Sequence, residues 1–147
     1  VAQRQSQRLA AEIELAAGLP EAALQRSPQE TGRPELMLRT QALLRVGRPA
    51  EVTGALQTWV VTHPHDAAAW QLLASAWQAQ GQPLRAVRAE AESHAARYDY
   101  AAAVDRFQAG QDLARKSSSA ADYIEASIID TRLRAMELLL KEQAAER

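Results

Sequence analysis

The chain has 147 residues, of which 17 are basic and 18 acidic, so its formal net charge at pH 7 is −1. This balance excludes a global electrostatic attraction to nucleic acid or to an anionic membrane. The absence of cysteine excludes a disulfide framework and thiol chemistry. Alanine is the commonest residue, at 32 positions, and such a composition favours an all-helical fold because these side chains lose little entropy in a helix.

The N-terminal region carries no pattern of basic residues followed by an apolar segment, as a signal peptide would. No apolar run approaches the roughly 18 residues that cross a bilayer, so we expect no membrane span. The chain begins at Val1 rather than Met, and residues 1–15 already have a helical pattern. We therefore expect a fragment of a longer protein.

Three Gly-x-Pro triplets occur in the chain, at residues 18–20, 47–49 and 81–83. Gly can adopt the left-handed conformation that ends a helix, and Pro suits the first turn of the next helix. The second and third triplets are 34 residues apart, which is the period of the tetratricopeptide repeat. The sequence thus predicts an all-α fold, a tetratricopeptide-like right-handed solenoid of antiparallel helix pairs.

The first repeat unit is predicted to be short, because its turn precedes the second by only 29 residues. Its second helix is expected over Pro20–Gln25, followed by a loop over Ser27–Pro34, a stretch rich in helix breakers. The second unit has a helix-ending Pro64, and Asp66 is a good N-cap for a helix that begins at Ala67. Its predicted packing positions are Leu36, Arg39, Thr40, Leu43, Val52, Leu56 and Trp59, of which Arg39 and Thr40 match the repeat poorly.

The third unit matches the repeat best. Its pattern positions are Trp70, Leu73, Ala74, Trp77, Gly81 and Ala86. A further turn is predicted at residues 98–100, only half a period later, so the helix over Pro83–Ala96 would serve both as the second helix of one unit and as the first of the next. Residues 1–116 are thereby assigned to repeats.

The remaining residues, 117–147, are predicted to form a long capping helix over Ala120–Ala144, so that the whole chain is one structural domain. Ser119 and Asp122 resemble a capping box at its start. The helix carries an apolar stripe at steps of four, three and four residues, formed by Ile129, Leu133, Met136 and Leu140. This stripe either covers the last repeat or forms a coiled-coil seam in a homodimer, and we favour the cap because the stripe is short.

No residue pattern indicates catalysis. His63 and His65 flank a proline in a predicted inter-repeat loop, and a metal site would need further ligands in fixed geometry. His94 does not belong to an H-E-x-x-H motif, and no P-loop, dinucleotide fingerprint or G-x-S-x-G elbow occurs. We expect this chain to be no enzyme and to hold no cofactor.

The aromatic residues are predicted to be core rather than a platform for nucleic-acid bases. Trp59, Trp70, Trp77 and Phe107 fall on packing positions of the repeat. No basic stripe is interleaved with them, so nucleic-acid binding is not expected.

The surface expected to bind is the concave face, which could hold an extended peptide through amides, hydroxyls and adaptable apolar side chains. The positions expected to be exposed on it are Arg8, Glu12, Met37, Gln41, Leu44, Gln71, Ser75, Gln78, Arg85, Arg88 and Glu92. Arg85 and Arg88 either hold a carboxylate or are ordinary solvated charges. The Lys and Asn residues of a chaperone-tail carboxylate clamp are absent, so that class of partner is not expected.

From Arg88 onward the sequence contains motifs that are more specific than a generic repeat. They are RAEAESHA over residues 88–95, the turn Tyr98-Asp99-Tyr100, a helix with Ala103-Val104-x-x-Phe107, and IDTRL over residues 129–133. This part of the sequence resembles the C-terminal end of the beta-barrel assembly-enhancing (BepA-like) proteases. These are zinc metallopeptidases of the HtpX-like gluzincin clan that carry a C-terminal tetratricopeptide domain. As architecture, the resemblance extends over residues 34–140.

The resemblance implies a periplasmic protein whose zinc-binding catalytic domain lies outside this chain. Its repeat domain would recognise outer-membrane assembly machinery or immature barrel proteins. Two other functions stay open: a stand-alone scaffold of a secretion or pilus assembly pathway, and a structural domain that self-associates through its last helix.

Overall fold

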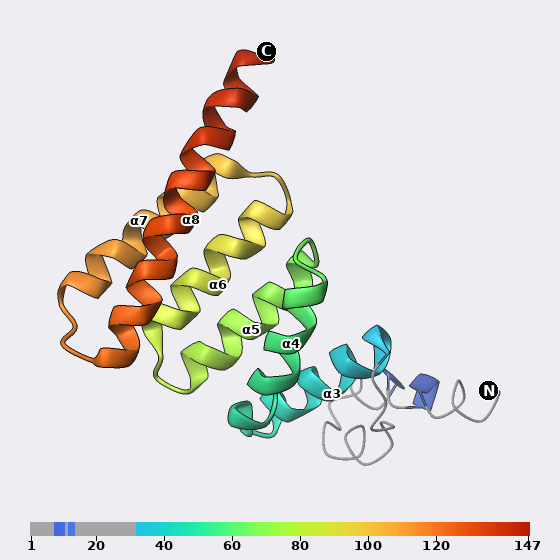
Figure 1. Ribbon diagram of the computed structural model, residues 1–147. Helices are drawn as coiled ribbons and strands as arrows, with labels where there is room; N and C mark the ends of the chain where they lie inside the picture. The colour runs from blue at the N-terminus through green and yellow to red at the C-terminus, as the bar shows by residue number, and fades with distance from the viewer. Residues whose placement is uncertain (1–7, 11, 14–31) are drawn as a thin grey trace. The chain divides into compact units, whose positions relative to one another are not determined.

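The computed structural model describes residues 8–10, 12–13 and 32–147 (Figure 1). Secondary structure in these residues is entirely helical, with no strand among them, which confirms the predicted all-α class for the described part of the chain. The chain divides into two compact units, residues 1–58 and residues 59–147. The predicted turn at residues 18–20 and the helix over Pro20–Gln25 lie outside the described residues.

In chain order the helices are α3 (Arg33–Arg45), the 3-10 helix η1 (Pro49–Glu51), α4 (Thr53–Thr62), α5 (Ala67–Ala79), α6 (Pro83–Ala96), α7 (Tyr100–Arg115) and α8 (Ala120–Ala145). α6 has the predicted bounds, and α8 ends one residue later than predicted. Of the helices described, none combines the length and the apolar character that crossing a membrane requires.

Three of the turns share one hydrogen-bond pattern. Each contains a residue with positive φ, which is +75° at Gly47, +69° at Gly81 and +63° at Tyr98. That residue donates its N–H to the carbonyl three residues earlier, and the next residue donates to the carbonyl five residues before it. This pair of bonds defines the Schellman motif that closes a helix. Left-handed turns are thus present where the sequence predicts turns at residues 47–49, 81–83 and 98–100.

Two helix starts have the caps expected of them. The Asp66 carboxylate accepts a hydrogen bond of 3.2 Å from the N–H of Ala69 at the start of α5. The Ser119 hydroxyl accepts from the N–H of Asp122 at 3.4 Å, which is half of the predicted capping box. The other half is missing, because the Asp122 carboxylate accepts instead from the Ser117 hydroxyl at 2.6 Å.

Two helix boundaries correct the sequence prediction. The sequence predicts that Pro49 opens an α-helix, but it opens η1, and α4 begins only at Thr53. The guanidinium of Arg48 bonds the carboxylate of Glu51, and a pair three residues apart suits the 3-10 helix, where such residues eclipse. Arg33, predicted in a loop, is the first residue of α3, because the proline after it tolerates the first turn of a helix.

In the unit of residues 1–58, α3 contacts η1 and contributes most of the described core. Leu43 of α3 and Leu56 of α4 are at most 1 % exposed. Thr40, a poor match to the repeat, is also buried at 1 % exposed. Of the four packing positions predicted on α3, Thr40 and Leu43 are buried, whereas Leu36 and Arg39 are only partly buried. The buried face also includes Leu38 and Ala42, which the repeat pattern does not identify.

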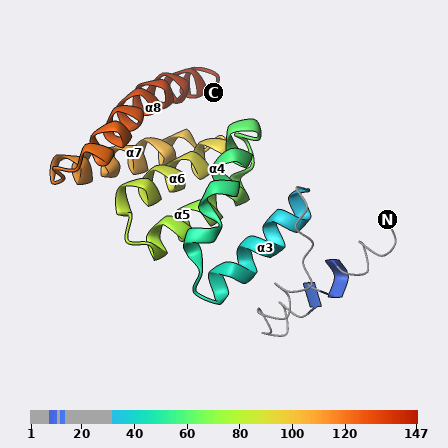
Figure 2. The ribbon, with the colours of Figure 1, turned by 60° about the horizontal axis from the view of Figure 1, so that its bottom comes forward.

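In the unit of residues 59–147, the helices α5 to α8 pack against one another in chain order, each antiparallel to the one before (Figures 1 and 2). α6 also contacts α8 directly, whereas no comparable contact joins α5 to α7. α8 therefore packs on α6 as well as on α7.

The core of this unit lies between α6, α7 and α8. Phe107 of α7 and Ile129 of α8 are fully buried, and Leu133 and Met136 lie in the same cluster. Three of the four residues of the apolar stripe on α8 thus pack inside the unit, and Leu140 is partly buried. Since this packing covers the stripe, the face that a coiled-coil seam would need is already used within the chain.

Candidate functional site

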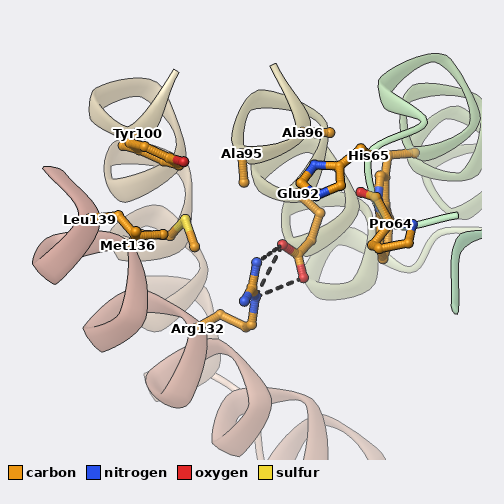
Figure 3. Close-up of a pocket in the computed structure, with 10 residues that line it drawn as sticks. Pro64, His65, Glu92, Ala95, Ala96, Tyr100, Arg132, Met136 and Leu139 are labelled. Atoms are coloured by element: carbon orange, nitrogen blue, oxygen red, sulfur yellow. Dashed lines mark hydrogen bonds and ion pairs between the residues drawn. The ribbon is translucent and has the colours of Figure 1, made fainter. Parts of the chain in front are cut away.

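Two hollows flank α6, on opposite faces of the helix. The α6–α8 cleft has a volume of about 440 Å³ and is lined by Pro64, His65, Trp70, Glu92, Ala95, Ala96, Tyr100, Arg132, Met136 and Leu139 (Figure 3). The α5–α6 groove has a volume of about 610 Å³ and is lined by Gln71, Ala74, Ser75, Gln78, Ala79, Ala86, Glu90, Ser93 and His94. The two sets of α6 residues are out of phase in the helical repeat, so they point away from each other.

A bidentate ion pair crosses the α6–α8 cleft. Arg132 donates from Nη2 to Glu92 Oε1 at 2.7 Å and from Nε to Glu92 Oε2 at 3.0 Å (Figure 3). Glu92 is buried, and the Arg132 side chain is about one-third exposed. A two-point contact of this kind holds both side chains in one geometry, so it fixes α8 against α6.

A second pair joins the same two helices. Arg88 of α6 lies 3.4 Å from Glu125 of α8 and 3.9 Å from Glu92, and its guanidinium lies 5.8 Å from the centre of the Trp70 ring. Two arginines and two glutamates thus alternate across the α6–α8 contact with no net charge. We call this set of ion pairs the clasp; its members are Arg88, Glu92, Glu125 and Arg132.

Three residues predicted on the concave face are engaged within the chain. Glu92, expected to be exposed, is buried under Arg132, because α8 covers this face of α6. Arg88 belongs to the same clasp. Arg85 donates to Gln82 at 2.9 Å and its guanidinium lies 5.3 Å from the centre of the Trp77 ring. The geometry therefore gives Arg85 and Arg88 partners other than a ligand carboxylate.

Two rings that the sequence assigns to turns, those of His65 and Tyr100, line the cleft, and the ring of Tyr98 contacts both. The ring of His65 stacks on that of Tyr98 at 5.6 Å, and Tyr98 meets Tyr100 edge-on at 6.4 Å. Gln143 of α8 donates to the carbonyl of Tyr98 at 3.1 Å. The sequence identifies the turn here, but it does not show that the turn is tied to the end of α8.

The α5–α6 groove brings together three residues predicted for the binding face. Gln71, Ser75 and Gln78 are all exposed, and they follow one face of α5 at steps of four and three residues. Alanines form much of the remaining wall. This arrangement places amide and hydroxyl groups beside small apolar side chains.

Some polar groups of the groove already have partners. The Ser75 hydroxyl donates to the Gln71 carbonyl at 3.2 Å, and the Ser93 hydroxyl donates to the Glu90 carbonyl at 2.6 Å. The Gln71 side chain accepts from Arg97 at 3.0 Å, which joins the far end of α6 to α5. Gln78 makes no side-chain hydrogen bond to the described residues, so its amide can serve a ligand.

The groove contains three residues that the sequence analysis missed. Glu90, Ser93 and His94 face α5 across the groove. They share the helical face of Ala86, which the repeat pattern does identify, and steps of four and three residues from Ala86 would have found Glu90 and Ser93.

The other predicted residues belong to the unit of residues 1–58. Gln41 is exposed on α3, and Met37 and Leu44 are partly buried there. Arg8 lies 4.0 Å from Glu12, one helical turn away. These five residues line neither the α6–α8 cleft nor the α5–α6 groove.

The predicted inter-repeat loop at residues 63–66 connects α4 and α5. The ring of His63 stacks on Trp59 at 3.8 Å. Trp59 in turn donates from its indole to Asp66 at 2.8 Å. Nowhere in the described part of the chain do three or more His, Asp or Glu side chains gather closely enough to hold a metal ion.

No protein-family model matches this chain, and no curated protein matches it significantly. The two hollows beside α6 are the surfaces on which this chain could hold a ligand. One is crossed by a neutral ion-pair clasp, and the other presents the Gln78 amide, which has no side-chain partner among the described residues.

Proposed function

We propose that this chain is a protein-interaction module that binds an extended segment of a partner polypeptide in the α5–α6 groove. The observation that carries this proposal is the row of Gln71, Ser75 and Gln78 along an alanine-lined hollow of about 610 Å³. A volume of this size lies within the range of ligand pockets in general.

The row matches the needs of a peptide backbone. From Gln71 to Gln78 the helix rises about 10 Å, which is the length of about three residues of extended chain. A peptide must exchange its hydrogen bonds to water for others, and side-chain amides supply both donors and acceptors. The alanines beside the row leave room for the backbone to approach the helix.

The proposal includes a tetratricopeptide-like solenoid as the scaffold. The supporting features are the two Gly turns 34 residues apart, the antiparallel packing of α5 to α8, and a terminal helix whose apolar stripe covers the preceding helices. Solenoids need a terminal cap of this kind because their last repeat would otherwise expose its apolar face.

The biological setting of the proposal comes from the sequence resemblance from Arg88 onward. It would place the chain in the periplasm, as the partner-recognition part of a zinc metallopeptidase that acts on outer-membrane assembly machinery or immature barrel proteins. A stand-alone scaffold would use the same groove. Self-association through α8 is less favoured, because Ile129, Leu133 and Met136 pack within the chain.

The test is selection from a library of random 12-residue peptides on the full 147-residue chain, followed by measurement of each enriched peptide's Kd. In the variant Ser75→Trp, a large ring would fill the groove from an exposed position. The matched control is Gln108→Trp, which places the same ring at an exposed position of α7 that lines neither hollow.

We expect Ser75→Trp to weaken binding of the enriched peptides at least tenfold and Gln108→Trp to leave it unchanged. Circular dichroism would verify that both variants keep their helix content. Equal binding to both variants would refute the groove as the peptide site.

A further inference from the structure

The α5–α6 groove contains a carboxylate that pairs with no counter-ion among the described residues. Among the described residues that line it, Glu90 is the only one with a formal charge at pH 7 when histidine is neutral. Glu90 is partly buried, so its charge is less screened by water than that of a fully exposed residue.

No neighbour within the described residues neutralises this charge. α5, which forms the opposite wall, contains no charged residue. The ion pairs of α6 involve Arg88 and Glu92, on the other face of the helix. Ser93 bonds the carbonyl of Glu90 rather than its carboxylate.

The cation nearest in sequence on the same face of α6 is Arg97. It lies two helical turns from Glu90 and donates to Gln71 at the end of the groove. Glu90 and Arg97 therefore give the groove an acidic middle and a basic end. A basic ligand residue is attracted to the middle and repelled from the end.

We infer that the segment bound in this groove is basic, and that it places a Lys or Arg side chain against the carboxylate of Glu90. This inference rests on the proposed function and names its ligand class. The amides of Gln71 and Gln78 then hold the backbone, while the ion pair selects the sequence.

The experiment uses three peptides that differ at one position, where an enriched peptide has Lys, Gln or Glu. Their Kd values are measured with the full chain, with Glu90→Gln and with Glu90→Lys. The control variant is Glu137→Gln, which removes one carboxylate from an exposed position of α8 outside both hollows.

The native chain and Glu137→Gln should bind the Lys peptide about two- to fivefold more tightly than the Gln peptide, the range of a solvent-accessible ion pair. Glu90→Gln should abolish this preference, and Glu90→Lys should shift it toward the Glu peptide. Raising the salt concentration should reduce the preference of the native chain.

The outcomes separate the two proposals. If Ser75→Trp blocks the peptides but Glu90→Gln keeps the full preference for Lys, the groove is the peptide site and the basic-ligand inference is wrong. If Ser75→Trp blocks none of them, both proposals fail.

Discussion

Arg132 and Glu92 are 40 residues apart in sequence, yet three N–H···O contacts of 2.7 to 3.2 Å join them across the α6–α8 cleft (Figure 3). The pair lies where α8 turns its inner face toward α6. Because this pair already occupies the charged groups of the cleft, the α5–α6 groove on the other face of α6 is the better candidate for a ligand site.

Replacing Arg132 by Met should destabilise the fold by about 1.5–3 kcal/mol, because it leaves the buried carboxylate of Glu92 with only the distant Arg88. The cost should fall below that of a fully buried pair, since Arg132 is about one-third exposed. Urea unfolding followed by circular dichroism measures this change.

The double variant Glu92→Leu with Arg132→Met should regain most of the lost stability, because both polar partners are then replaced by apolar groups. If the stability lost in the double variant equals the sum of the losses in the two single variants, the two side chains are not coupled.

Two Gly→Ala substitutions seven residues apart, at Gly47 and Gly54, should have opposite effects on stability. Gly47→Ala should destabilise by about 1–2 kcal/mol, because φ is +75° there and a Cβ disfavours the left-handed region. Gly54→Ala in α4 should be neutral or stabilise by up to about 1 kcal/mol, since alanine favours the helix. A Cβ at either position would meet no atom within 4 Å, so crowding does not contribute.

Both variants can be compared by denaturant unfolding of the full chain. An equal effect of the two substitutions would contradict the left-handed turn at Gly47.

Tyr98 offers the converse test, because it occupies the turn position that Gly holds elsewhere. Tyr98→Ala should be less stable than Tyr98→Gly by about 1 kcal/mol, the reverse of helix propensity, since only Gly relieves the positive φ of 63°. Both variants lose the ring contacts with His65 and Tyr100, so these cancel in the comparison. Melting temperatures in the opposite order would contradict the assigned backbone conformation.

Glu51 should titrate below the ordinary range of a glutamate. The hydrogen bond from Arg48 is the main cause of its lowered pKa, and the charges of Arg48 and Arg39 act in the same direction. The pairing therefore contributes stability above the ordinary pKa, and this contribution is lost as the pH falls through the lowered pKa. A carbon-detected NMR titration should show the Glu51 midpoint rise in Arg48→Ala, and an unchanged midpoint would rule the pairing out.

Local features of the fold could be predicted from the sequence because neighbouring residues determine them. The start of α6 at Pro83 and the turn at Gly81 follow from backbone restrictions, and the buried face of α8 follows from its helical spacing. The 3-10 helix at Pro49 could not be predicted from the Gly-x-Pro triplet at residues 47–49 alone. It is accompanied by the pair of Arg48 with Glu51, and Glu51 lies beyond the triplet.

The site was harder to predict, because the sequence shows the faces of a helix but not which helix covers each face. α6 was expected to expose Arg85, Arg88 and Glu92, yet contacts with residues 37 and 40 positions away occupy Arg88 and Glu92. Gln71, Ser75 and Gln78 on α5 are exposed, as the sequence predicts. Their neighbours across the groove on α6 depend on the antiparallel pairing of α5 with α6, which requires the tertiary structure.

The central claim is that polypeptide partners bind between α5 and α6. Its most direct test is a titration of the ¹⁵N-labelled full chain with an enriched peptide, observed by two-dimensional amide NMR. We predict that the largest shifts occur at Gln71, Ser75 and Gln78 and at Ser93 and His94 across the groove. Shifts concentrated at Arg132, Met136 and Leu139 in the α6–α8 cleft, with the α5 amides unmoved, would contradict the account.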